Sequence, residues 1–224
     1  MLDGLEGFRE RLEGLFERTP YEVAVVLHPR PLALALAHPW LPLARLAAAP
    51  ASRRYFAGWF SRREIHVLAP DALEGRASAT AGSLEALMLT PEHEYAHLVI
   101  GANNPDLPPP FTPASFARYL SWAWLCEGAA AYLSGQVPHL RAAIVRRLRE
   151  GPRPVFPPSA RDAFLLGGTV FSLLEREAGP EAAAALAEEP LAVGPRELIE
   201  RVFERRLHRV ERDWREQLDS LRAS

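Results

Sequence analysis

Two histidines four residues apart flank a glutamate in the segment His93-Glu94-Tyr95-Ala96-His97. On a helix, residues four apart lie one turn from each other on the same face, so both imidazoles can bind a single ion. Two imidazoles at this spacing can share one Zn²⁺, and the glutamate beside the first of them can reach a metal-activated water as a general base. The spacing therefore predicts zinc ligands at His93 and His97 and a catalytic base at Glu94.

A catalytic zinc needs a third protein ligand and one open position. The segment Trp124-Leu-Cys-Glu-Gly-Ala-Ala-Ala-Tyr132 supplies a carboxylate, Glu127, 30 residues after His97. An acid among apolar and small residues is expected to be buried, and a buried carboxylate requires a partner or a metal. We expect Gly128 and the alanines after it to let this helix approach the histidine helix closely. His139 remains an alternative ligand by reach, although it follows a proline in a connection.

The pattern HExxH followed by WLxEGxAxY resembles the gluzincin metallopeptidases of the peptidase MA-like group. The resemblance continues through residues 164–181 and 210–218, and so covers about residues 90–220. It implies a zincin-like fold, Zn²⁺ as cofactor, and a peptide or protein substrate. It also implies that His93, His97 and Glu127 are the zinc ligands and Glu94 the base. The metzincin pattern is excluded because it would require glycine and histidine where Ile100 and Asn103 stand.

The chain departs from the family pattern at two positions. Ala131 stands where many gluzincins carry a carboxylate that hydrogen-bonds a ligand imidazole. We therefore expect a backbone carbonyl, a water or another acid to orient the ligands. Phe164 replaces the tyrosine of the family, so an oxyanion would need another donor. The candidates are Tyr119, Tyr132 and His139.

Other residues that could do chemistry are interpreted as structural. Cys126 is adjacent to Glu127 and points about 100° away from it on a helix, so we expect a small buried side chain. Tyr95 should face away from the metal and pack in the core. Phe116, Leu120 and Trp124 recur every four residues as a core stripe. The remaining histidines have no partner at ligand spacing and are read as structural or surface residues: His28, His38, His66 and His208.

These residues require a helical scaffold beside a small sheet. Short β-branched runs predict strands at 21–28 and 63–69, and a weaker signal predicts a third within 53–60. A helix is expected up to Pro20, and further helices at 90–101, 112–134, 138–150, 160–178, 180–188 and 195–220. The predicted class is α+β, with an N-terminal helix and small sheet in residues 1–80 and a helical metallopeptidase-like part in residues 81–224. By analogy, substrate would add to the edge of the strand at 63–69.

Composition limits the partners of the chain. Its 26 basic residues are all arginine, and with 28 acidic residues the net charge is −2. This balance argues against a nucleic-acid partner, because nucleic-acid-binding domains concentrate basic residues. The first 20 residues are predicted to form an amphipathic helix rather than a signal peptide, and no stretch is apolar enough for a membrane span, so we expect a cytoplasmic protein. The alternative to a peptidase is a zinc-binding scaffold of the same kind with little or no turnover.

Overall fold

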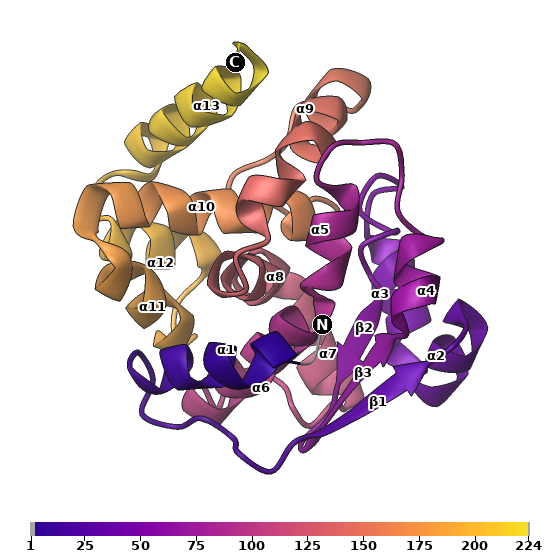
Figure 1. The fold of residues 1–224 in the computed structure, drawn as a ribbon. Coiled ribbons are helices and arrows are strands. Elements are labelled where there is room, and N and C mark those ends of the chain that lie inside the picture. Colours follow the sequence, from indigo (N-terminus) through magenta and orange to yellow (C-terminus); the bar gives the residue numbers. More distant parts are fainter. Residues whose placement is uncertain (1–2, 224) are drawn as a thin grey trace.

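The computed structural model describes residues 3–223, with a small sheet on one side and helices on the other (Figure 1). The sheet has the order β1-β3-β2, with β1 (Ala24–His28) parallel and β2 (Gly58–Phe60) antiparallel to β3 (Glu64–Leu68). All three predicted strands are present, and the α+β class is confirmed. The expectation that substrate adds to the strand at 63–69 is wrong, because β3 is the central strand and both its edges are already paired.

Short helices surround the sheet and lead the chain into the helical part. These are α1 (Asp3–Glu13), α2 (Pro31–Ala37), α3 (Trp40–Ala47), α4 (Pro70–Glu74) and α5 (Ser83–Met88). Proline occupies the first turn of α2 and of α4, where its missing N–H costs no hydrogen bond. In Figure 1, α2, α3 and α4 lie beside the sheet, whereas α1 lies next to α6 in the helical part.

The helical part follows the predicted order, with two breaks. Its elements are α6 (Thr90–Asn103), α7 (Pro113–Ser121), α8 (Ala123–Leu133), the 3₁₀ turn η1 (Val137–Leu140), α9 (Arg141–Glu150), α10 (Ala163–Ala178), α11 (Pro180–Glu188), α12 (Pro195–Val202) and α13 (Leu207–Ala223). The single helix expected at 112–134 divides at Trp122, whose φ of −109° and ψ of 19° are not helical. The helix expected at 195–220 also divides, near Glu204, which has a φ of +50°.

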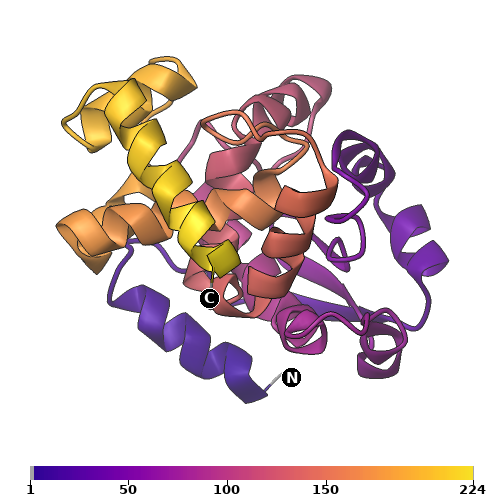
Figure 2. The same cartoon turned by 90° about the horizontal axis from the view of Figure 1, so that it is seen from above.

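Helix α8 lies at the centre of the molecule, surrounded by α5, α6 and α10, and α13 crosses the outside of this layer (Figures 1 and 2). Residues 90–100 of α6 and 123–131 of α8 are all buried, so neither helix has a solvent face over those stretches. The hydrophobic core includes side chains from both predicted parts, for example Phe8 and Ile65 with Trp124 and Trp214. No helix between residues 3 and 223 is long and apolar enough to cross a membrane.

The close contact made by Gly128 is with α10, which corrects the expectation that it faces the histidine helix. A Cβ on Gly128 would lie 2.5 Å from the backbone carbon of Gly167, and a Cβ on Gly167 would lie 2.5 Å from the carbonyl oxygen of Trp124. Real side chains do not tolerate such distances, so the two backbones can meet only through paired glycines. This contact fixes how α8 lies on α10.

Replacing Gly167 with alanine should therefore destabilise the protein, because the added methyl meets backbone that cannot move aside. We expect a loss of about 1–3 kcal/mol in the free energy of unfolding, measured by denaturant titration. Gly7 is the matched control, since a Cβ there meets nothing within 4 Å and the residue lies inside α1. Gly7→Ala should be neutral or stabilising by up to about 1 kcal/mol. Equal effects of the two substitutions would contradict the contact.

Three histidines that are distant in sequence meet beside strands β1 and β3. His28 Nε2 lies 2.9 Å from His66 Nδ1, and the ring of His38 is centred 3.9 Å from that of His66. Glu64 is the acidic neighbour, with Oε2 3.2 Å from His66 Nε2, while His38 Nε2 is buried without a hydrogen-bond partner. Burial, and then the charges of His66 and His28, lower the pKa of His38 from 6.5 to about 4.

This histidine cluster should make stability depend on pH. Because the folded pKa of His38 is about 4 and its unfolded value 6.5, the unfolded chain binds more protons between these values. Stability present above pH 6.5 is therefore lost as the pH falls toward 4. Melting temperatures should decline over this window, and the decline should be shallower in His38→Asn. Exposed His208→Asn is the control and should keep the original slope; identical slopes in all three proteins would refute the assignment.

Candidate metal centre

His93, His97 and Glu127 converge inside the helical part, where α6 packs on α8. His93 Nε2 and His97 Nε2 are 3.2 Å apart, and each lies 3.4 Å from an oxygen of Glu127. The three side chains are buried, and one ligand atom from each lies within 4.8 Å of the others. The four-residue spacing on α6 aligns the imidazoles as predicted, and α8 brings in the carboxylate. The group could hold a metal ion.

A side-chain amide and a phenol contact two of the candidate ligands, in place of the backbone carbonyl or second acid that we expected. Gln136 Oε1 lies 2.8 Å from His93 Nδ1, and Gln136 Nε2 donates to the carbonyl of Ala86 at 2.6 Å. Because the amide nitrogen is committed to Ala86, the amide oxygen accepts the proton of Nδ1 and leaves Nε2 free as a ligand. The hydroxyl of Tyr119 donates to Oε1 of Glu127. Gln136 and Tyr119 therefore hold the donor atoms of His93 and Glu127 in position.

Electrostatics favour the protonation states that bind metals. Burial raises the pKa of Glu127, but its contacts with the imidazoles of His93 and His97 outweigh burial, so that the net shift is downward. Burial lowers the pKa of His97, opposed by the hydrogen bond and charge of Glu127. The carboxylate is thus ionised and the His97 imidazole neutral, as coordination requires.

Burial, followed by the charge of Glu127, raises the pKa of Glu94 well above its usual value.

Glu94 lies against β2 and lines the same small cavity as His93, His97 and Glu127. A Cβ on Gly58 would come within 2.6 Å of Glu94 Oε1, so glycine at the start of β2 makes the space for this carboxyl group. The adjoining cavity has a volume of about 10 Å³. Its wall is largely aromatic: Tyr55, Phe56, Trp59, Phe60 and Phe164. Space of this size admits about one water molecule.

No known protein-family model, curated protein or solved structure that was compared with the chain matches it.

The other candidate residues lie in different surroundings. Tyr119 reaches the ligands but donates its hydroxyl to Glu127, whereas Tyr132 stacks on Phe171 and His139 lines a separate cavity. Cys126 is buried and free, as predicted. Tyr95 is also buried, as predicted, and its hydroxyl donates to the carbonyl of Pro20 at 2.5 Å.

Sequence reasoning missed Gln136 and Tyr55. Gln136 is 43 residues from His93, and a lone glutamine after the Ser134-Gly135 turn has no spacing that could have identified it. Tyr55 stacks on Phe164 with ring centroids 5.4 Å apart and an interplanar angle of 9°. It therefore places a phenol in the cavity wall where Phe164 has none. The loss of a hydroxyl at Phe164 was a signal to search for such a tyrosine.

Gln136→Leu should weaken metal binding, because His93 loses the acceptor that fixes its ring and tautomer. We expect about a 10- to 100-fold lower affinity for Zn²⁺, measured by competition with a chromophoric chelator. Gln217→Leu is the matched control, since this part-buried amide bonds the carbonyl of Thr169 away from the site. The control should bind Zn²⁺ as the unmodified chain does. Unchanged affinity in folded Gln136→Leu would contradict the positioning role.

Proposed function

We propose that the chain is a zinc-dependent metallopeptidase of the gluzincin type that hydrolyses peptide bonds. The carrying observation is the spacing of the three donors. Two ligands about 2.05 Å from a tetrahedral zinc would be about 3.3 Å apart. The two imidazole nitrogens of His93 and His97 are 3.2 Å apart, which fits that value, and each lies 3.4 Å from a different oxygen of the Glu127 carboxylate. Two imidazoles with one carboxylate leave a fourth position open, which is the arrangement of catalytic rather than structural zinc sites.

The residues of the chain have separate roles in this proposal. His93, His97 and Glu127 would hold the ion, with Gln136 and Tyr119 maintaining their orientation. Zinc bound there would polarise a peptide carbonyl and lower the pKa of a water molecule. Glu94 would accept the proton of the attacking water and donate it to the leaving amine. Its carboxyl group shares the small cavity with the three ligands.

A second candidate is a zinc-binding scaffold with little or no peptidase turnover, acting as a structural or interaction module. The small cavity favours this function, because a volume of about 10 Å³ cannot admit a peptide unless the wall formed by Tyr55 and Phe56 moves. The absence of a hydroxyl at Phe164 points the same way. A scaffold would gain stability from the ion and hydrolyse nothing.

Two substitutions separate metal binding from turnover. Glu127→Ala should abolish stoichiometric Zn²⁺ binding and the accompanying rise in melting temperature, because it removes a ligand. Glu94→Gln should bind one equivalent of Zn²⁺ and lose activity toward a mixed peptide library by about 100-fold or more. Metal content, thermal shift and mass-spectrometric detection of cleavage provide the measurements.

Each outcome selects one function. Zinc binding with cleavage that depends on Glu94 supports the peptidase. Zinc binding and stabilisation without cleavage by the unmodified chain support the scaffold. Failure of the unmodified chain to bind zinc would overturn both.

A further inference from the structure

A second functional feature lies outside the metal centre, on the side of the molecule that carries the sheet. A cavity of about 600 Å³ opens between the end of β1, helix α3, the loop after α3 and helix α4. Among residues 3–223, its charged lining consists of four arginines, with no aspartate or glutamate: Arg45, Arg53, Arg54 and Arg76. We refer to it as the arginine cavity.

Backbone carbonyls hold two of these side chains in place. Arg76 donates to the carbonyl of Arg53 at 2.7 Å and also to that of Arg54. Arg53 donates through Nε to the carbonyl of Ala48 at 3.1 Å. These bonds use neutral acceptors, so they orient the guanidinium groups without neutralising them. None of the four arginines forms an ion pair with an acidic residue in the stretch from 3 to 223.

The positive charges in the arginine cavity repel one another. Burial, and then the charges of Arg45 and Arg54, lower the pKa of Arg76 to about 10. Burial and the charge of Arg53 likewise lower the pKa of Arg45. Arg76 remains protonated at neutral pH, so the like charges persist and their repulsion is not relieved by titration. Partly buried charges of one sign usually have a counter-charge, and the surrounding chain does not provide one.

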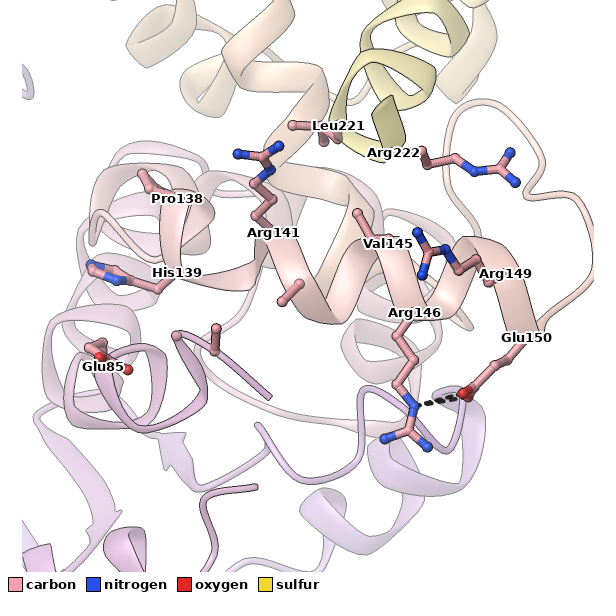
Figure 3. Close-up of a pocket in the computed structure, with 13 residues that line it drawn as sticks. Glu85, Pro138, His139, Arg141, Val145, Arg146, Arg149, Glu150, Leu221 and Arg222 are labelled. Carbon is pink, nitrogen blue, oxygen red and sulfur yellow. Dashed lines mark hydrogen bonds and ion pairs between the residues drawn. The ribbon is translucent and has the colours of Figure 1, made fainter. Parts of the chain in front are cut away.

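A second cavity, of similar size, provides a contrast. It has a volume of about 680 Å³ and lies between α9, η1 and the end of α13 (Figure 3). It also contains arginines, but Glu85 and Glu150 are part of its wall, and Arg146 pairs with Glu150 at 2.9 Å. Arg222 lies 3.5 Å from Asp219. Here the chain supplies its own counter-charges, whereas the arginine cavity is open to an external one.

We propose that the arginine cavity binds a small, multiply charged anion that carries phosphate groups. The planar guanidinium fork matches phosphate oxygens in a bidentate manner, and several forks facing one cavity can share one ligand. A phosphate group carries more negative charge than a single carboxylate, and so better balances four cations. The site is independent of the metal centre in its ligands, although Arg54 directly precedes Tyr55 in the chain. Metal binding and peptidase activity need not hold for this site to exist.

Titration calorimetry with inorganic pyrophosphate tests the proposal directly. Pyrophosphate should bind the unmodified chain and raise its melting temperature. Arg45→Gln and Arg76→Gln should each weaken the affinity by about tenfold or more, as expected for loss of a hydrogen bond between charged groups. Arg149→Gln is the matched control, because this arginine lines only the larger cavity in Figure 3. It should leave the affinity unchanged, and citrate should bind more weakly than pyrophosphate.

The outcomes are separable even if one variant fails to fold. Arg76 also holds the backbone of the loop after α3, so Arg76→Gln could be unstable. The side chain of Arg45 donates no hydrogen bond to residues 3–223, so Arg45→Gln alone tests the proposal in that case. Absence of pyrophosphate binding, an unchanged affinity in Arg45→Gln, or a loss in Arg149→Gln would overturn the site. Citrate binding as tightly as pyrophosphate would overturn its assignment to phosphate.

Discussion

The position of Glu127 depends on how closely α8 can approach α10. The next residue, Gly128, meets Gly167 at a distance that no side chain permits. This backbone contact sets the depth and rotation of α8, and therefore the direction in which the preceding carboxylate points. Residues on one helix are related by fixed angles, so a shift of Gly128 would move Glu127 with it. The metal group is thus built from a local spacing on α6 and a non-local contact that lies on the other side of α8.

Because His93, His97 and Glu127 are buried, their polar groups need partners inside the protein. An unpaired carboxylate in this interior would be costly, and two imidazoles facing it leave their own N–H groups to be satisfied. Gln136 and Tyr119 meet part of that requirement, one at each kind of ligand. They do so with neutral groups, so the only formal negative charge among the donors stays on Glu127. A dication would then meet one carboxylate and two neutral imidazoles, which is a common composition for zinc in hydrolases.

The sequence predicted those parts of the molecule that depend on local periodicity. The pairing of His93 with His97 follows from the helical repeat, the starts of α6 and α7 follow from their first-turn prolines, and the end of α8 follows from Gly135. Features that depend on tertiary contact could not be read from one sequence. Gln136 approaches His93 only because η1 folds back beside α5, and the partner of Gly128 is set by a helix that begins 35 residues later. The parallel pairing of β1 with β3, which joins Ala24 to Glu64, is equally non-local.

The loop after α3 connects the arginine cavity with the candidate metal centre. The segment after α3 carries Arg53 and Arg54 into the arginine cavity, and its next residues, Tyr55 and Phe56, form the wall of the metal cavity. Arg76 holds the carbonyls of this loop from the sheet side, whereas Phe164 packs against both aromatic rings from the helical side. In the proposed peptidase, a movement that admits a peptide to the three candidate ligands would break one of these two attachments. The stacking on Phe164 is the weaker, since it involves no hydrogen bond, and Tyr55 can turn away without disturbing the backbone that Arg76 holds. In the proposed peptidase, access to the candidate metal centre would therefore depend on the aromatic packing on α10.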